Sequence, residues 1–364
     1  MIGLGLSITQ LAVRQMLGFN PLSLFAANEP GVWYDPSDLT TLFQDAAGTT
    51  PVTAVEQPVG RMLDKSGNGA HASQATATSR PVLSARYNQL LNTVAMTGGY
   101  WIATNIITTA NQITAPDGTL TGELVTSTST STYHLRAYGF FLPVSLNNTF
   151  TVSLSKGTQR YLAVIVGDAD GNRYGCNVDT DNWSIVSTGT AASGVFTSAT
   201  IKQNVSNSWY EITITGSTIG TAVAVYVAAR DSSAWNGDTL ASVTGGGTWY
   251  NCGFDYRATN TGVGLPAYQR VNTATDYDTI GFPRYLKFDN IDDAHNTTFA
   301  ASLGTNCTIA RAVPGVGASI LTGQTVGTTF TNTTTHAGLL VIDRPLTAGE
   351  TAQLTAFFNE KAGV

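Results

Sequence analysis

The chain has 364 residues, which is long enough for two or three domains, and 42% of them are hydrophobic, as in an ordinary folded protein. Charged residues make up only 12%, and 18 Lys and Arg against 24 Asp and Glu give a net charge of −6. There is no basic run, so neither nucleic acid binding nor membrane insertion is expected, and the abundant small polar residues favour β-sheet faces and tight turns.

Residues 1–30 form an apolar N-terminal segment that lacks the features of a signal peptide. It has no basic start, Arg14 interrupts it, and no run reaches the roughly 20 apolar residues of a membrane span. So short a segment cannot make its own core, and it packs either on its own domain or into a neighbouring subunit. We predict an attachment or oligomerisation arm. Its key apolar residues are Leu6, Leu11, Met16, Leu17 and Phe19.

Residues 31–90 contain short apolar runs that are interrupted by turn signals. An Asp-Pro pair breaks the stretch GVWYDPSDLTTLF, and LDKSGNGAHA carries an Asn-Gly pair that supplies the positive φ angles of a tight turn. The sequence therefore predicts short strands and loops in this region.

Residues 92–262 contain many strand candidates at intervals of about ten residues. Segments such as TFTVSLSKG and YLAVIVGDADGN alternate apolar and polar residues and end at turn residues. This spacing predicts an all-β sandwich or jelly roll. The predicted core positions are Phe150, Val152, Leu154, Leu162, Val164, Val166, Trp209, Ile212, Ile214, Val223, Val225 and Val227.

The C-terminal segment RPLTAGETAQLTAFFNEKAGV has the apolar period of a helix. Thr347 and Glu350 have the spacing of a capping box, and Gly363 can end the helix. We expect this helix to pack on an adjacent sheet. The residues predicted to share its buried face are Leu346, Leu354, Phe357 and Phe358.

Several of these segments resemble virion proteins of tailed bacteriophages. GVWYDPSDLTTLFQDAAGTTPV, FPRYLKFDNIDD and the terminal DRPLTAGETAQLTAFFNEKA resemble pieces of a concanavalin A-like (laminin-G-like) module that such proteins carry. TAPDGTLTGELV, NSWYEITITG and GFDYRATNTGVGLPAYQRVNTATDYD resemble the carbohydrate-binding-module-like jelly roll inserted in many of them. The resemblance covers most of residues 31–364.

The expected fold is therefore mainly β. A jelly-roll sandwich formed by residues 92–262 is inserted in a small discontinuous β domain, made of residues 31–90 plus 275–364 and closed by the C-terminal helix. The arm of residues 1–30 precedes both.

Three carboxylates, Asp289, Asp292 and Asp293, follow a short apolar run in PRYLKFDNIDD. On a strand, the side chains of Asp292 and Asp293 would point to opposite faces, so the two could not act as an acid and base pair. We predict that the cluster caps the strand end and its turn; a metal site is the alternative.

The stretch GDADGN spaces Asp168, Asp170 and Asn172 in a way that partly mimics a calcium loop. The acidic residue that closes an EF-hand loop is missing. A polar turn is the favoured interpretation, and a structural Ca²⁺ bound by these three residues is the alternative. No other cofactor is expected.

Exposed aromatic side chains are candidates for a glycan-binding site, because sugar rings stack on flat aromatic faces. Most aromatic residues, however, belong to hydrophobic cores. Trp183 in DTDNWS and Trp235 in DSSAWNGD stand in polar surroundings and are the candidates for glycan contact.

No catalytic motif is found in the sequence. It contains no GxSxG, HExxH or phosphate-binding loop, and its four histidines stand in no recognisable relation to a nucleophile. Cys176, Cys252 and Cys307 lie far apart without a CxxC pair, which favours free thiols in a protein made in a reducing cytoplasm. An enzyme is not expected.

The leading hypothesis is a bacteriophage virion structural protein, a tail, fibre or capsid-decoration subunit, made in the host cytoplasm. It would assemble with other virion proteins through its N-terminal arm as a homo-oligomer, with a trimer suggested by analogy with phage fibres. The alternative is a receptor-contacting fibre or tip module that binds host-surface glycan. A polysaccharide depolymerase is the least favoured hypothesis.

Overall fold

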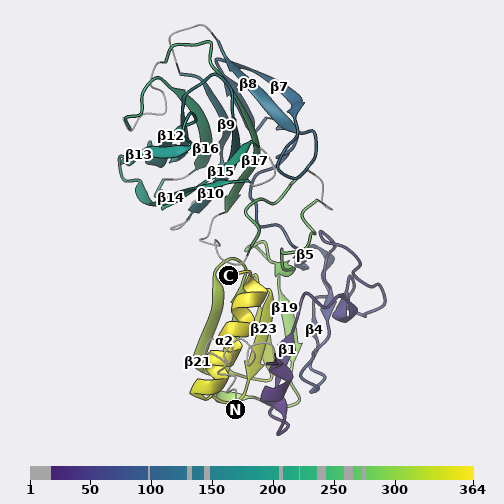
Figure 1. The fold of residues 1–364 in the computed structure, drawn as a ribbon. Coiled ribbons are helices and arrows are strands. Elements are labelled where there is room, and N and C mark those ends of the chain that lie inside the picture. The colour runs from purple at the N-terminus through teal and green to yellow at the C-terminus, as the bar shows by residue number, and fades with distance from the viewer. Residues whose placement is uncertain are drawn as a thin grey trace, which may run out of the picture. The chain divides into compact units, whose positions relative to one another are not determined.

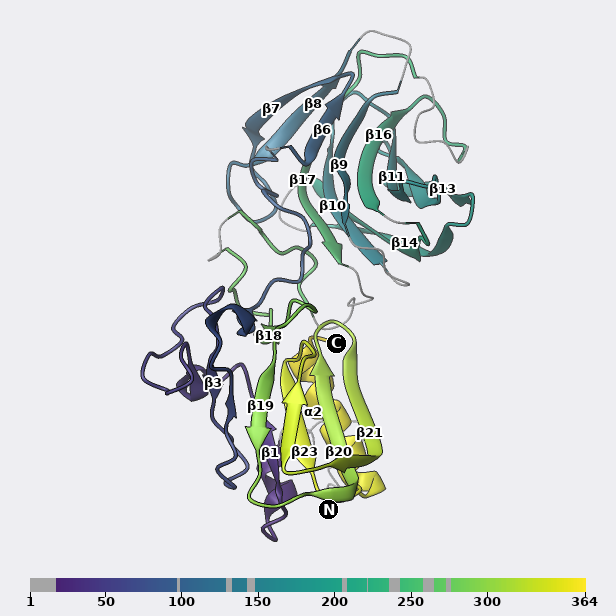
Figure 2. The ribbon, with the colours of Figure 1, turned by 180° about the vertical axis from the view of Figure 1, so that it is seen from behind.

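The computed structural model describes residues 18–96, 99–128, 133–142 (backbone only for 140–142), 148–204, 208–220, 222–235, 243–257, 265–272 and 276–364. The chain forms two compact units (Figures 1 and 2). The discontinuous unit contains the described residues of Met1–Ala85, Val263–Leu265 and Asp278–Val364, and the inserted unit those of Arg86–Gly262 and Pro266–Tyr277. Among the described residues, no helix is long and apolar enough to cross a membrane.

The inserted unit is a sandwich of two six-stranded antiparallel sheets. In spatial order the first sheet contains β14 (Val195–Gln203), β15 (Trp209–Ser217), β10 (Asn148–Lys156), β17 (Thr248–Arg257), β8 (Gly122–Ser127) and β7 (Ile106–Ile113). The second contains β13 (Ser184–Ala191), β12 (Arg173–Asp179), β11 (Tyr161–Asp168), β16 (Val223–Arg230), β9 (Leu135–Leu142) and β6 (Trp101–Thr104). Most connections cross from one sheet to the other, as in a jelly roll.

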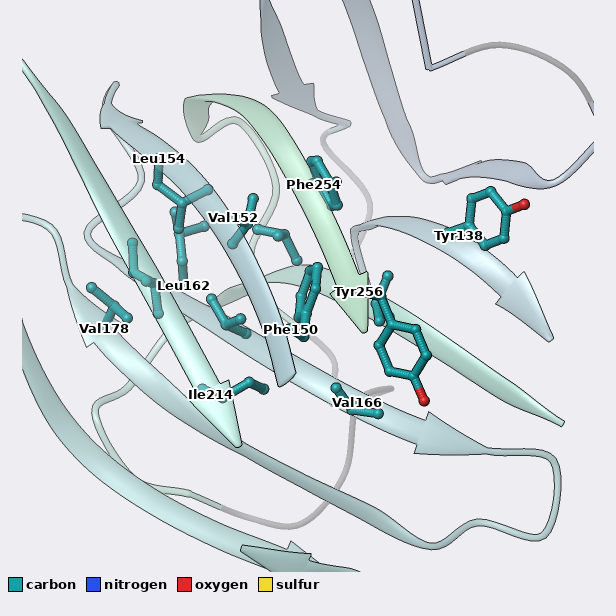
Figure 3. Packing of buried hydrophobic residues seen from close by; sticks show 14 of the residues in the cluster. Tyr138, Phe150, Val152, Leu154, Leu162, Val166, Val178, Ile214, Phe254 and Tyr256 are labelled. Carbon is teal, nitrogen blue, oxygen red and sulfur yellow. The ribbon is translucent and has the colours of Figure 1, made fainter. Parts of the chain in front are cut away.

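The core of the sandwich follows the alternation of its strands. Figure 3 shows residues such as Phe150 and Val152 of β10 pointing between the sheets, where Leu162 of β11 and Ile214 of β15 also lie. The predicted core positions are all buried, but Trp209 lies outside this cluster. Because Ile212 and Ile214 point inward, the period of two turns Trp209 to the opposite side of its sheet.

Trp209 packs there with Ala115 and Cys252, and its indole donates a hydrogen bond to the carbonyl oxygen of Thr114 at 2.7 Å. Trp209 is therefore a fully buried core residue, as predicted, but it belongs to a smaller core cluster on the outer side of its sheet.

A buried ion pair joins the two sheets. Glu123 of β8 accepts two hydrogen bonds from the guanidinium of Arg136 of β9, Nε to Oε2 and Nη2 to Oε1, both at 3.0 Å. The amide of Asn251 donates a third bond to Oε2 at 3.0 Å. Paired and hydrogen-bonded in this way, the two buried charges link the two sheets.

The discontinuous unit interleaves the two ends of the chain. Its four-stranded sheet has the order β1 (Gly31–Tyr34), β23 (Gly338–Ile342), β20 (Gly304–Val313) and β21 (Gly317–Val326). A five-stranded sheet contains β2 (Leu42–Phe43), β3 (Arg61–Met62), β4 (Ala72–Ser73), β19 (His295–Thr298) and β22 (Thr329–Asn332), and β18 (Tyr285–Lys287) pairs with β5 (Val82–Ser84). Its described residues also include the 3₁₀ turns η1 (Pro21–Phe25), η2 (Leu39–Thr41) and η3 (Ala77–Ser79).

Helix α2 (Ala348–Ala362) lies across the four-stranded sheet (Figure 2). The capping box of Thr347 and Glu350 is present, and Gly363 ends the helix with a φ of 79°. Leu354 and Phe358 are buried, as predicted. Phe357 is only half-buried, because three residues from Leu354 it lies at the flank of the buried stripe.

The boundaries between the units differ from the prediction by a few residues, since residues 86–90 and 276–277 belong to the inserted unit. The side chain of Asn88 explains the first shift. Its Nδ2 donates to the carbonyl oxygens of Phe254 and Gln269, at 3.0 and 2.8 Å. These bonds fasten the linker to the sandwich.

Candidate functional sites

The acidic cluster forms a turn after β18. Oδ1 of Asp289 accepts hydrogen bonds from the backbone N–H groups of Ile291, Asp292 and Asp293, at 2.8, 3.2 and 3.2 Å. These donors lower the pKa of Asp289. In return, the backbone N–H of Asp289 donates to Oδ2 of Asp293 at 2.9 Å. The carboxylates therefore close the turn that follows the strand.

The segment is a turn and not a strand, so the alternation that would separate Asp292 from Asp293 does not apply. One carboxylate oxygen of each of Asp289, Asp292 and Asp293 lies within 4.8 Å of those of the other two. Asp292 accepts a bond from the hydroxyl of Ser79 at 2.7 Å. Each of the three is thus engaged with protein donors.

The carboxylate of Asp168 closes the hairpin between β11 and β12. Its Oδ1 accepts from the backbone N–H groups of Asp170 and Asn172, each at 3.0 Å. Its Oδ2 accepts from Nδ2 of Asn172 at 2.8 Å and from the N–H of Gly220 at 2.7 Å. Asp168 is also only 2% exposed, so a cation would have to displace some of these donors.

The two candidate tryptophans have different surroundings. Trp183, at the turn between β12 and β13, is half-exposed and stacks on Tyr210 with a centroid distance of 4.0 Å and an interplanar angle of 8°. Its φ of 48° lies in the left-handed region, which a bulky residue rarely occupies. Trp235 instead lies over Gly189 and packs against the outer side of the second sheet.

A small pocket on the outer side of the first sheet was missed by the sequence analysis. It has a volume of about 70 Å³, and its lining includes Asp117, Glu211, Cys252 and Tyr268. The Tyr268 hydroxyl lies 3.0 Å from that of Thr93, and burial raises the pKa of Glu211. These residues come from separate loops and strands, so only the fold brings them together.

Of the predicted assembly residues, Leu6, Leu11, Met16 and Leu17 lie outside the described residues. Phe19 is described, and its ring packs edge-on against Phe357 of α2 at a centroid distance of 6.0 Å. Both rings line a groove with a volume of about 1260 Å³ between the outward side of α2 and residues 278–284.

The three cysteines are free and buried. Burial raises the pKa of Cys176 to about 12, which keeps this thiol protonated and unreactive at neutral pH.

Comparisons with known proteins give little guidance. No family model matches the sequence, and no curated protein matches it. A solved structure of the enzymatically active domain of tailspike protein 4 from bacteriophage CBA120 is similar, with 13% sequence identity and a TM-score of 0.28. The match covers 48% of this chain but only 22% of that one. So distant a similarity assigns neither a family nor a function.

Proposed function

We propose that the protein is a bacteriophage virion structural subunit, a component of a tail appendage or a decoration of the particle, with no catalytic role of its own. The observation that carries the proposal is the division of the chain into two units: the discontinuous unit, built from both ends of the chain, and the inserted sandwich. The same division is implied by the sequence resemblance to virion proteins of tailed phages.

The use of the polar clusters supports a structural role. The carboxylate oxygens of Asp289 and Asp168 accept hydrogen bonds from backbone N–H groups of their own turns, and Asp168 also accepts from the N–H of Gly220. Acidic residues used in this way hold loops in shape. A subunit that must keep a fixed form in a repeated assembly benefits from such turns.

The test is the composition of the particle. Virions of the phage or prophage that encodes the chain would be purified and examined by mass spectrometry and by an electron cryomicroscopy map. We expect the chain in the particle with a fixed copy number and fitted density. Its absence from purified, infectious particles would refute the proposal.

A second function, glycan binding at the host surface, is favoured by the geometry of Trp183. The backbone of this residue adopts a conformation that costs of order 1–3 kcal/mol for a non-glycine residue, and such conformations gather at functional sites. Tyr210 supports one side of its indole and holds the ring flat. A rigid, half-exposed aromatic plate suits stacking on a sugar ring.

This alternative is tested with Trp183→Ala and Trp235→Ala against Val186→Ala, a matched control at an exposed residue of the adjacent strand β13. Glycan binding predicts that Trp183→Ala lowers binding to host-surface polysaccharide by at least tenfold while the control leaves it unchanged. Reducing-end release by the unmodified protein in the same assay would instead indicate a depolymerase.

A further inference from the structure

The small pocket on the outer side of the first sheet holds two carboxylates with which no described Lys or Arg forms an ion pair. Glu211 is half-buried in its lining and has no hydrogen bond with a described residue, and Asp117 lies exposed at the rim. We propose that this pocket binds the primary ammonium group of an unbranched alkyl chain, the chemistry of a lysine side chain on a protein or peptide partner. This binding goes beyond the structural role proposed above and does not depend on it.

Three neighbouring strands form the floor of the pocket. Glu211 of β15 lies opposite Ser153 of β10, which in turn lies opposite Cys252 of β17. Because Val152 and Leu154 point between the sheets, the period of two turns Ser153 to the outer side. A carboxylate, a hydroxyl and a thiol therefore stand side by side across the sheet.

The hydroxyl of Ser153 points to a ligand independently of the carboxylates. Ser153 is only 8% exposed, and its hydroxyl has no hydrogen-bond partner among the described residues. The outward hydroxyls on either side of it along β10 are both paired, that of Thr151 with Thr213 at 3.0 Å and that of Ser155 with Ser208 at 3.2 Å. A buried hydroxyl without a partner is costly, so we expect a bound group to complete it.

The free polar atoms of the pocket are mainly acceptors. Oδ1 of Asp117 accepts from the N–H and hydroxyl of Thr119, at 2.9 and 2.6 Å, but its Oδ2 accepts from no described residue, and neither does the carboxylate of Glu211. An ammonium group offers three donors and a compensating charge. Lys202 does not fill this role, because it lies exposed on β14, on the side of Glu211 away from Ser153, and does not line the pocket.

The size and apolar lining of the pocket favour the end of an alkyl chain. Val94, Ala115 and Pro116 line it beside the polar groups and can contact methylene groups. Its volume is about 70 Å³, whereas a cavity of about 150 Å³ holds one benzene ring. An amino-sugar ring is therefore too large to enter. The polar side chains of the pocket are also not among the described groups whose ligand atoms gather closely enough for a metal ion.

The undescribed residues of the inserted unit cannot supply the positive charge. They contain no lysine, arginine or histidine, and they are residues 97–98, 129–132, 143–147, 205–207, 221, 236–242, 258–264 and 273–275. If one of these segments covered the pocket, Glu211 would still lack a counter-ion, and burying its charge would cost more. The cation therefore comes from outside this unit.

An NMR titration of the isotope-labelled full chain tests the proposal. Butylammonium should shift the amide signals of Ser153 and Gly253 saturably, whereas butanol, the same chain without the charge, should not. N-acetyl-lysine methylamide should behave like butylammonium, and glucosamine should not bind. Glu211→Gln should raise the dissociation constant of butylammonium at least about tenfold, through loss of a charge-assisted hydrogen bond. The matched control Asp181→Asn removes the same charge at an exposed site of the same unit and should leave the constant unchanged.

The absence of saturable shifts in folded protein overturns the proposal, as does equal binding by Glu211→Gln and the unmodified chain. Calcium chloride producing the same shifts would make the pocket a metal site, and glucosamine binding as tightly as butylammonium would make it an amino-sugar site; either result refutes the assignment. Ser153→Ala, which changes no charge, should raise the dissociation constant roughly threefold or more. An unchanged constant in that variant would contradict the contact with the hydroxyl. Unchanged amide signals outside the pocket confirm that each variant is folded.

Discussion

In the inserted unit, strands such as β17 run for ten residues, as β20 and β21 of the discontinuous unit also do, whereas β2, β3 and β4 in the five-stranded sheet of the discontinuous unit have only two residues each. Long strands with alternating side chains bury one continuous core, and the alternation itself fixes which side faces inward. Short strands offer few ladder hydrogen bonds, so their loops need other supports. The comparison therefore separates the inserted unit, specified by its hydrophobic pattern, from the short-stranded five-stranded sheet of the discontinuous unit, which depends on individual polar contacts.

Asp64 is the clearest of these polar supports in the discontinuous unit. Its Oδ1 accepts from the N–H groups of Trp33 and Ser66, at 3.0 and 2.9 Å. Its Oδ2 accepts from the hydroxyl of Ser66 at 2.7 Å and the N–H of Gly69 at 3.0 Å. One side chain thus joins β1 to the loop between β3 and β4.

The largest expected effect is a loss of stability of the discontinuous unit in mild acid. His295 and His336 are fully buried around Phe288, and burial lowers their pKa values from 6.5 to about 4 and about 3. Both histidines become protonated near pH 6.5 in the unfolded chain but stay neutral at that pH in the folded one. The unfolding free energy is therefore unaffected above pH 6.5 and decreases below it. It decreases by up to about 1.4 kcal/mol per pH unit for each histidine, which amounts to several kcal/mol by pH 4.

Hydrogen exchange between pH 7.5 and 4.5, corrected for intrinsic rates, measures the pH dependence of the unfolding free energy for each unit separately. In the discontinuous unit, His336→Leu should remove about half of this pH dependence. Neither ring nitrogen of His336 has a hydrogen-bond partner among the described residues, so the substitution leaves no acceptor unpaired there. Equal slopes for the variant and the unmodified protein would show that these histidines do not control acid stability.

The next effect concerns the inserted unit and the buried ion pair that links its sheets. Glu123→Ala leaves Arg136, which is 4% exposed, buried without its counter-ion. We expect the sandwich to lose roughly 3–5 kcal/mol of unfolding free energy, measured by denaturant titration.

The matched control is Asp181→Ala, which removes exposed ion pairs with Lys156 at 2.7 Å and with Arg160 at 3.3 Å in the same unit. Its expected cost is below about 1 kcal/mol. If both substitutions cost the same, the hydrophobic pattern alone specifies the sandwich and the buried pair is dispensable.

The same contrast explains what the sequence could predict. The strands of the inserted unit and their core residues can be predicted because alternation is a local signal, which also places the buried Trp209 on the other side of its sheet from Ile212 and Ile214. The capping box at Thr347 was predicted because both partners lie within one turn. The pocket around Glu211 and Tyr268 and the pair of Glu123 with Arg136 could not be predicted, because their members are distant in sequence and meet only in the folded sheets.

A smaller effect is expected at the start of α2. Thr347→Ala removes the side chain that accepts from the N–H of Glu350 at 3.2 Å. The unfolding free energy of the discontinuous unit should fall by about 1 kcal/mol, the usual cost of removing an N-cap side chain. The measurement is a lower melting temperature. Gly349→Ala is the control, since a methyl group added there meets no neighbouring atom and alanine favours the helix. A destabilising effect of Gly349→Ala would mean that this end of α2 is covered by another element.

The smallest effect distinguishes the members of the acidic turn after β18. Asp289 accepts hydrogen bonds from three backbone N–H groups, whereas Asp292, at an exposed site, accepts one from the Ser79 hydroxyl among the described residues. Asp289→Ala should therefore destabilise the turn more than Asp292→Ala does and speed hydrogen exchange at residues 291–293. Asp292→Ala should cost less than about 0.5 kcal/mol, as most exposed substitutions do.

A larger effect of Asp292→Ala, with exchange at 291–293 unchanged in Asp289→Ala, would show that the turn is held by contacts other than its backbone caps. A cation that protected the turn in Asp292-containing protein only would identify the cluster as a metal site instead.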